Sequence, residues 1–330
     1  MDIWRTPSDI PSDLAASVLT IGIFDGVHRG HQVVIDRTVE LARECGCLPV
    51  ALTFDPHPFA VHNPDFSINM VCTLEDRLDR LAAAGIEACY VQEYTLDYAQ
   101  ATPREFVENQ LVGQLKARSI VVGEDVRFGR NNSGDGALLK ELGEEFGCYV
   151  ELVEDLTDGQ GRRWSSTWLR ELLAKGDVAG AREVLGRPHR VRGTVVRGFQ
   201  RGRALGFPTA NLTGDDLGEV PADGVYAGWL VKTAPGSNAA VYLPAAISVG
   251  TNPHFGNKER TVEAHVLGRA DLNLYDTPIA LDFVERIRPM MKFDSLDELT
   301  ARMDEDIRLT AQILGVPTAG RVNPDDVTAQ

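Results

Sequence analysis

The sequence predicts an α/β domain built on a doubly wound parallel sheet, followed by an antiparallel β-barrel domain that a C-terminal helix closes. Three observations support this. Apolar runs of strand length alternate with amphipathic segments up to about residue 153. After Pro188, strand-like runs are separated only by Gly, Pro, Asn and Asp turns. The length of 330 residues also exceeds the usual size of one domain.

In the first half, near-continuous apolar strands alternate with helices, which is typical of a parallel sheet covered on both faces. Thr102 is a candidate N-cap, with Pro103 at the first helical position. The expected strands are 18–24, 48–54, 87–92, 119–123 and 148–153, and the expected helices are 32–44, 73–84, 103–116 and 137–146.

Two short helices, 166–175 and 177–185, lead to a boundary near Arg187, so we expect domains of residues 1–186 and 187–330. Strands without intervening helices then indicate an antiparallel barrel. A long helix follows a capping box of Ser295 and Glu298, and residues from 318 onward are expected to fray. The expected strands are 190–197, 225–231, 245–249, 261–267 and 278–287, and the apolar stripe of the helix is Leu296, Leu299, Met303 and Ile307.

Composition narrows the function classes. The formal net charge of −15 argues against a nucleic-acid partner, because binding a phosphate backbone needs a basic surface. No segment approaches the ~18 apolar residues of a membrane span, and the N-terminus does not resemble a signal peptide, so a cytoplasmic protein is expected. An odd number of cysteines argues against a disulfide framework. We therefore expect free, mostly buried thiols at Cys45, Cys47, Cys72, Cys89 and Cys148.

The segment GIFDGVHRGHQ (22–32) directly follows an apolar strand and precedes a helix. Its glycines permit tight turns and close backbone approach, and a helix N-terminus suits a phosphate. His28 and His31 would add hydrogen-bond donors without fixed charge, as stabilising a transferring phosphate requires. Three other interpretations stay open at this point: a metal pair completed by His57, His62 or carboxylates, ordinary surface histidines, and glycines that only mark a turn.

Three further polar segments follow strands of the predicted sheet. TFDPHP (53–58) follows the second strand, VVGEDVRFGRNNSGD (121–135) the fourth, and RWSSTWLR (163–170) opens the next helix. Each has a simpler interpretation as a turn cap or a surface charge. Ligands of parallel sheets bind beyond the carboxyl ends of the strands, so the combination predicts a nucleotide-binding rim.

A second set of polar residues lies in the barrel half. GFQRGRALGFPTANL (198–212) lacks the P-loop pattern, yet it offers donors for phosphate and, at Thr209 and Asn211, oxygen ligands for Mg²⁺. In TVEAHVL (261–267), Glu263 shares one strand face with Thr261 and His265. Strand periodicity alone favours a solvent-facing glutamate there, although a mid-strand glutamate is rarely buried without a partner.

These motifs resemble the bacterial bifunctional riboflavin kinase/FAD synthetases, whose first half belongs to the nucleotidylyltransferase superfamily. The resemblance runs from about Thr20 to about Leu314. It implies a Rossmann-like FMN adenylyltransferase domain and a six-stranded antiparallel riboflavin kinase barrel. The implied reactions are phosphorylation of riboflavin to FMN by ATP, and adenylylation of FMN to FAD with release of pyrophosphate.

For the first domain, the resemblance implies that His28 and His31 stabilise the transition state as pyrophosphate leaves. Val126 stands where the family often has an aromatic residue. The implied ATP-site residues are Gly22, Phe24, Asp25, Gly26, His28, Gly30, His31, Asp125, Arg163, Ser166 and Thr167, and the implied flavin-site residues are Asp55, His57 and Phe128.

For the second domain, the resemblance implies that Glu263 is the base that takes the proton of the ribityl 5′-hydroxyl, and that Thr209 and Asn211 bind Mg²⁺. The implied residues for ATP and its phosphates are Gly202, Arg203, Gly206, Phe207, Pro208, Thr209 and Asn211. Partners would be riboflavin, FMN and ATP, with homo-oligomerisation left open. Three alternatives remain: a kinase with a degenerate first domain, a flavin carrier without turnover, and a remote likeness to aminoacyl-tRNA synthetases.

Overall fold

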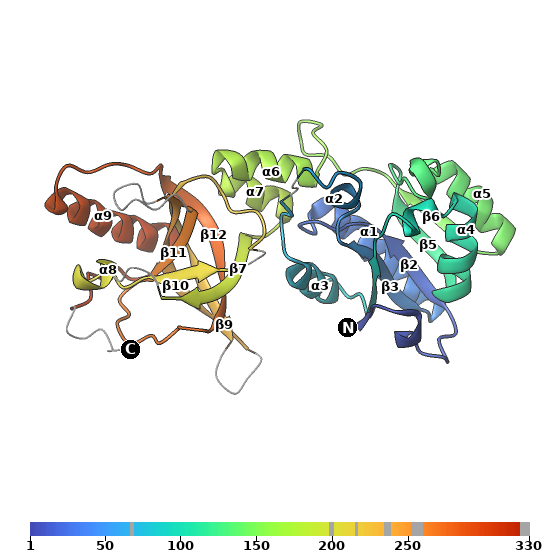
Figure 1. Ribbon diagram of the computed structural model, residues 1–330, viewed down its shortest axis with the longest axis horizontal. Coiled ribbons are helices and arrows are strands. Elements are labelled where there is room, and N and C mark those ends of the chain that lie inside the picture. The colour runs from blue at the N-terminus through green and yellow to red at the C-terminus, as the bar shows by residue number, and fades with distance from the viewer. Residues whose placement is uncertain (67–68, 198–200, 215–216, 234–238, 252–259, 324–330) are drawn as a thin grey trace. The chain divides into compact units, whose positions relative to one another are not determined.

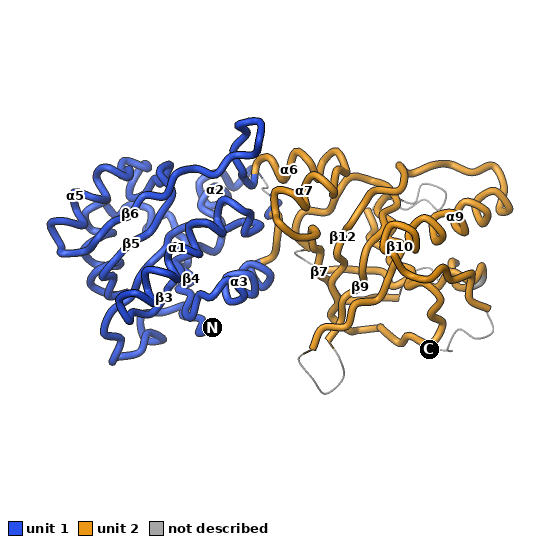
Figure 2. Tube along the Cα trace, turned by 180° about the vertical axis from the view of Figure 1, so that it is seen from behind, with its two compact units in different colours: residues 1–70, 74–166 blue, residues 71–73, 167–330 orange. Residues whose placement is uncertain are grey.

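The computed structural model describes residues 1–66, 69–197, 201–214, 217–233, 239–251 and 260–323. The chain divides into two compact units (Figure 2). Unit 1 comprises residues 1–70 and 74–166, and unit 2 comprises residues 71–73 and 167–330. Within the described ranges, no helix is both long and apolar enough to cross a membrane.

Unit 1 is built on a six-stranded sheet in the order β1-β4-β3-β2-β5-β6, in which every neighbouring pair is parallel (Figure 1). From β2 the chain adds β3 and β4 on one side of the sheet and then β5 and β6 on the other. The segments that follow β2 and β5 therefore diverge at a topological switch point, where α/β sheets bind ligands. The strands are β1 (Asp2–Trp4), β2 (Ser17–Ile21), β3 (Leu48–Asp55), β4 (Ala88–Glu93), β5 (Ala117–Gly123) and β6 (Tyr149–Val153).

Helices cover both faces of this sheet, as the apolar strands predict. Residues of α1 and α3 pack on one face around Ala51 and Cys89, whereas residues of η3 and α5 pack on the other around Leu52 and Ile120. The helical segments of unit 1 are η1 (Pro7–Asp9), α1 (Arg29–Cys45), α2 (Pro58–His62), α3 (Leu74–Ala83), η2 (Tyr98–Gln100), α4 (Pro103–Glu105), the π-helical η3 (Phe106–Gln114), η4 (Arg130–Asn132) and α5 (Gly136–Phe146).

Several expectations for unit 1 need correction. The first predicted strand ends at Ile21, and Phe24 lies in the following turn with a left-handed φ of 53°. The helix expected over 103–116 begins at Pro103 after its Thr102 cap, but continues as a π-helix from Phe106. Strand β1 was not expected, because three residues are too few to show a period.

The expectation of five free thiols is wrong for one pair. Cys45 and Cys47 form a disulfide, whereas Cys72, Cys89 and Cys148 are free and buried. Gly46 ends helix α1 in a left-handed conformation, and this turn brings the two flanking side chains together.

Unit 2 contains a closed barrel in the order β10-β11-β8-β7-β12-β9, and all its pairings are antiparallel. Strand β8 was not expected as a strand, because four residues are too few to show a period and they overlap the end of the GFQRGRALGFPTANL segment. The elements are α6 (Ser166–Lys175), α7 (Val178–Leu185), β7 (His189–Val196), α8 (Arg201–Ala204), β8 (Ala210–Thr213), β9 (Gly224–Thr233), β10 (Ala240–Thr251), β11 (Arg260–Val266), β12 (Pro278–Arg288) and α9 (Leu296–Leu314).

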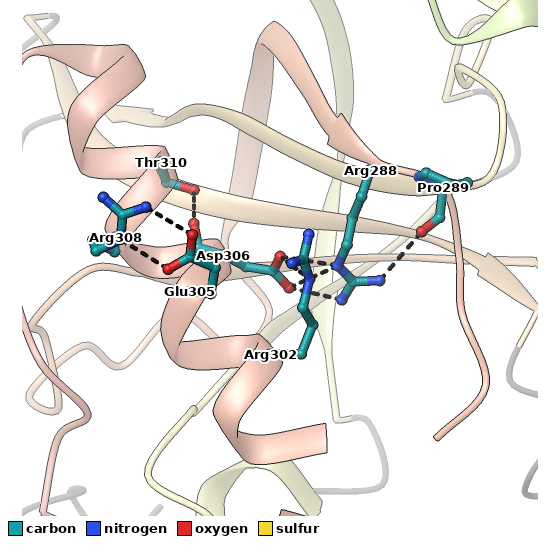
Figure 3. A network of polar contacts seen from close by, with 7 residues as sticks. All are labelled: Arg288, Pro289, Arg302, Glu305, Asp306, Arg308 and Thr310. Atoms are coloured by element: carbon teal, nitrogen blue, oxygen red, sulfur yellow. Dashed lines mark hydrogen bonds and ion pairs between the residues drawn. The ribbon is translucent and has the colours of Figure 1, made fainter. Parts of the chain in front are cut away.

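Helix α9 begins at the predicted Ser295 cap and packs on the barrel. Of its predicted apolar stripe, Ile307 is buried, but Leu296 is 59% exposed, so the first turn does not join the core. A buried ion pair between Arg288 of β12 and Asp306 of α9 fastens the helix (Figure 3).

Residues after α9 were expected to fray from 318, but the segment packs on unit 2 as far as Val322; residues 324–330 lie outside the described residues. Val316 and Ala319 pack against a buried cluster that contains Phe207 and Ile307. Arg321 forms a bidentate ion pair with Asp304 of α9. Apolar contacts that no periodic pattern reveals therefore hold this segment on the barrel.

Candidate active sites

The loop between β2 and α1 places two histidines at a helix N-terminus. His28 is the N-cap of α1, and its Nδ1 accepts the backbone N–H of His31 at 3.3 Å. The two rings stack, with centroids 3.7 Å apart and planes 20° from parallel. Since Nδ1 of His28 accepts a hydrogen bond, its neutral ring carries the proton on Nε2. The helix N-terminus adds a partial positive charge beside both rings.

His31 is held neutral by its surroundings. Burial lowers the pKa of its imidazole well below the ordinary value of 6.5, and the nearby His28 and Arg163 lower it further. Its Nδ1 is buried without a hydrogen-bond partner among the described residues. A buried polar atom that lacks a partner costs free energy unless a ligand satisfies it. The geometry therefore suits a bound polar group.

The glycines of this loop make room for the rings. A Cβ on Gly22 would lie 3.1 Å from the Phe24 ring, and one on Gly30 would lie 3.1 Å from the His28 ring. The Phe24 ring in turn meets His31 edge-on at 5.4 Å. Gly26 adopts a φ of 78°, which a residue with a side chain rarely takes. Each predicted glycine thus has a steric reason to be there.

Residues from two later segments join the same loop. The Ser166 hydroxyl, at the start of α6, donates to the Asp25 carbonyl at 2.8 Å. Arg163 pairs with Asp125 after β5 and, at 3.1 Å, with Asp155 after β6. The charge of Arg163 also contributes to lowering the pKa of His31. The predicted neighbour Thr167 is exposed in the first turn of α6.

The carboxyl end of β3 carries an aromatic group beside the predicted Asp55 and His57. His57 caps α2, and its Nδ1 accepts the Phe59 N–H at 3.0 Å. Phe54 meets the Tyr94 ring edge-on at 5.8 Å, and Tyr94 contacts Tyr98 and His62. The sequence-based prediction missed these aromatics because the two tyrosines follow β4, where no motif marks them.

Phe128 does not join that group. It is 7% exposed and packs against Phe106 in the core of unit 1. A Cβ on Gly134 would lie 2.7 Å from its ring, so the ring is closely enclosed. Its predicted flavin contact therefore remains a prediction that its burial does not favour.

Arg77 of α3 ties the ends of β2 and β3 together and was not predicted. It is 2% exposed, and its Nη1 donates to the Ile23 carbonyl at 2.9 Å and to the Phe54 carbonyl at 3.1 Å. It also reaches the Thr53 hydroxyl at 3.2 Å. The sequence offers no signal for this role, because Arg77 lies on a charged helix whose arginines are ordinarily exposed.

In unit 2, the PTAN motif and the VEAHV strand lie side by side. Strands β8 and β11 pair so that Asn211 faces Glu263 in register. The Thr209 hydroxyl donates to Glu263 at 3.2 Å, and the Asn211 amide donates to the Thr209 hydroxyl at 3.3 Å. Glu263 is therefore not the solvent-facing residue that strand periodicity favoured.

Burial raises the pKa of Glu263 above its ordinary 4.5, and hydrogen bonds from Thr209 and Thr261 oppose that shift. Thr209 and Asn211, which lie beside this carboxylate, also line a pocket of the described structure, although Glu263 itself is not among its lining residues. The pocket is lined by the predicted Arg203, Pro208, Thr209 and Asn211, and by Arg269 and Tyr275, which were not predicted. Gly202 lies in α8 and Gly206 in the loop that follows it, whereas residues 198–200 and 252–259 lie outside the described residues.

Comparison with known proteins connects both sites to one family. Residues 10–168 match the family model for FAD synthetase, and residues 185–314 match that for riboflavin kinase. A bifunctional riboflavin kinase/FMN adenylyltransferase of Bacillus subtilis (strain 168) is 34% identical over 301 residues, which is 90% of this chain and 92% of that protein. The chain belongs to the family of bifunctional riboflavin kinases/FMN adenylyltransferases.

Another relative with the same description, from Escherichia coli (strain K12), is 34% identical over 295 residues, 89% of this chain and 91% of its own. A crystal structure described as a macrolide-efflux protein from Streptococcus pneumoniae shares 30% identity and a TM-score of 0.82, covering 93% of this chain and 97% of that one. These alignments thus extend over both units of this chain.

Proposed function

We propose that this chain catalyses two successive steps of flavin cofactor synthesis. ATP phosphorylates riboflavin to FMN in unit 2, and a second ATP adenylylates FMN to FAD, with release of pyrophosphate, in unit 1. The observation that carries the proposal is that each unit holds its own phosphate-handling group: the stacked histidines at the α1 N-terminus, and Glu263 with Thr209 beside a pocket. We assign residues 1–186 to the adenylyltransferase and residues 187–330 to the kinase, so that α6 and α7 join the first domain although residues 167–186 belong to unit 2.

In the adenylyltransferase, the FMN phosphate attacks the α-phosphorus of ATP, and the bond to the β-phosphate breaks. Negative charge then gathers on the departing pyrophosphate. His28 and His31 stabilise that charge with N–H groups that are already fixed in place, and the α1 N-terminus adds its dipole. Arg163 approaches the same phosphates. Because His31 is neutral, it does not hold the negatively charged product as a fixed cation would.

The flavin ring of FMN needs an apolar surface close to this site. Asp55 and His57 lie where β3 ends, next to Phe54 and Tyr94. Aromatic faces of this kind stack on planar heterocycles. We therefore place the isoalloxazine ring at the carboxyl end of β3.

In the kinase, Glu263 accepts the proton of the ribityl 5′-hydroxyl as its oxygen attacks the γ-phosphorus of ATP, and ADP leaves. Burial raises the pKa of Glu263 and makes the carboxylate a stronger base than an exposed one. Thr209 and Arg203 both line the pocket and would contact the phosphates. Positioning then accounts for most of the remaining rate enhancement.

The oxygen atoms of Thr209 and Asn211 fit a magnesium ion. They are hard donors on neighbouring side chains, but the Asn211 amide presents its nitrogen to the Thr209 hydroxyl at 3.3 Å, so the amide would have to turn its oxygen toward Thr209 for both oxygens to hold the ion. Among the described residues, no cluster of three or more His, Cys, Asp or Glu could hold a metal by itself. An ion shared with ATP matches that donor set, and Mg²⁺ would neutralise phosphate charge there.

The substrates of both steps are small cytoplasmic molecules, and we place the enzyme in that compartment. The formal net charge of −15 disfavours a nucleic-acid partner.

The proposal is tested by incubating the purified chain with riboflavin, ATP and Mg²⁺ and separating the flavins by chromatography over time. FMN should rise first and then give way to FAD. FMN that accumulates without FAD would refute the adenylyltransferase half. No FMN from riboflavin, together with FAD formed from added FMN, would refute the kinase half.

Two substitutions separate the sites. His31→Ala should slow FMN adenylylation ~10²–10³-fold, the usual cost of one preorganised donor, and should leave riboflavin phosphorylation unchanged. Glu263→Gln should do the reverse and cost ~10²–10⁴-fold in the kinase step. Glu285→Gln, at an exposed position of β12, is the matched control and should leave both steps unchanged. Equal loss of both activities in one folded variant would contradict separate sites.

A further inference from the structure

The kinase pocket depends on a loop that reaches Thr209 from α8. The loop passes through Gly206 and Phe207, and Phe207 is only 1% exposed. Phe207 packs in a buried cluster with Leu267 of the barrel and Ile307 of α9. A glycine-rich loop has many alternative conformations, so something must select the one that presents Thr209.

His265 of β11 holds this loop by a hydrogen bond. It lies two residues after Glu263 and therefore shares its strand face. It is 5% exposed, and its Nδ1 lies 2.9 Å from the Pro208 carbonyl oxygen. A carbonyl oxygen only accepts, so Nδ1 carries the proton and donates. The bond thus fixes the carbonyl group directly before Thr209, and the His265 ring also meets Phe207 edge-on at 5.7 Å.

The segment after α9 holds the same loop at a second point. The Val322 N–H donates to the Gly206 carbonyl at 3.2 Å, and the Arg321 guanidinium lies 5.6 Å from the centre of the Phe207 ring. Gly206 has a φ of 83°, and a Cβ there would lie 2.6 Å from the Val322 carbonyl oxygen. The ion pair of Arg321 with Asp304 anchors this segment to α9 in turn.

We propose that His265 is a positioning residue for riboflavin phosphorylation, and that residues 316–323 form a second anchor for the same phosphate-binding loop. His265 sets the Pro208–Thr209 peptide so that the Thr209 hydroxyl reaches Glu263, and the C-terminal segment prevents Gly206 and Phe207 from moving away. This inference rests on the proposed kinase activity of unit 2.

Two substitutions of His265 separate positioning from packing. His265→Leu removes the donor, whereas His265→Asn keeps an N–H at the position of Nδ1. The leucine variant should lose about 10- to 100-fold in kcat/KM for Mg·ATP, the size of effect that a small displacement of a reacting group causes. The KM for riboflavin should change much less. The asparagine variant should recover most of the loss, and FMN adenylylation should stay at the wild-type rate in both variants.

The second anchor has its own test. That test keeps the proposal falsifiable even if His265→Leu does not fold. Arg321→Ala, whose side chain is 46% exposed, should raise the KM for Mg·ATP several-fold at unchanged thermal stability. Arg308→Ala, which breaks a similar exposed ion pair elsewhere on α9, is the control and should have no kinetic effect.

The inference is overturned if folded His265→Leu keeps kcat/KM for Mg·ATP within twofold of wild type. It is also overturned if His265→Asn loses as much as His265→Leu, or if Arg321→Ala behaves like Arg308→Ala. A wild-type chain that produces no FMN would instead refute the proposed function, and this inference with it.

Discussion

The buried ion pair between Arg288 and Asp306 gives a stability prediction that depends on burial. The Arg288 guanidinium donates from Nε and Nη2 to both oxygens of Asp306 at 2.7–3.1 Å, and the two side chains are 8% and 6% exposed. Figure 3 shows this pair where α9 crosses the end of β12. Replacement of Asp306 by Asn removes the negative charge and leaves a buried guanidinium without a counter-ion.

The expected cost follows from that geometry. Breaking a buried pair by removing one partner costs about 3–5 kcal/mol, because the other charge stays out of water. Arg302, whose Nε lies 3.6 Å from Asp306, is 34% exposed and can regain solvent, so it adds little. The introduced asparagine can still accept one hydrogen bond, which favours the lower end of the range. We expect Asp306→Asn to lower the free energy of unfolding by about 3 kcal/mol.

Urea unfolding measures this cost, with riboflavin phosphorylation as the reporter of unit 2 and FMN adenylylation as the reporter of unit 1. Glu305→Gln is the matched control, because Glu305 makes an exposed ion pair with Arg308 on the same turn of α9. That change should cost less than about 1 kcal/mol. The double variant Arg288→Met/Asp306→Leu should regain most of the loss. If Asp306→Asn costs no more than Glu305→Gln, the burial argument is wrong.

Two further predictions concern pH and metal. Burial lowers the pKa of His189 from 6.5 to about 4, so the fold holds its neutral form and the unfolded chain binds the proton first as pH falls. The free energy of unfolding that is present above pH 6.5 should therefore fall by up to about 3 kcal/mol on acidification to pH 4. His189→Gln should remove that pH dependence. If urea unfolding gives parallel curves of free energy against pH for the wild type and the variant, this prediction is wrong. EDTA should abolish both activities and excess Mg²⁺ should restore them in the flavin assay. Riboflavin phosphorylation that continues in EDTA would refute the roles given to Thr209 and Asn211.

Much of the fold could be predicted from the sequence, because alternating apolar strands and helices have few compact solutions. The parallel sheet, the antiparallel barrel and the Ser295 cap of α9 all follow from local patterns. Short strands such as β1 and β8 could not be predicted, since three or four residues are too few to show an alternation of apolar and polar side chains. The end of β2 was misplaced because the Phe24 turn is apolar in sequence but left-handed in conformation.

For the candidate sites too, some features could be predicted from the sequence and others could not. By itself the sequence predicted the chemistry that we propose for the two sites, because His28, His31, Thr209 and Glu263 occur in motifs whose residue types suit phosphate transfer. Only the tertiary structure decided what surrounds them. The site loops are held by Arg77 and by the segment after α9, which are distant from them in the chain. They are also held by His265, which lies on a strand face that no sequence motif marks. Such roles depend on which backbone carbonyls come within hydrogen-bond reach, and long-range packing sets that distance, not local sequence.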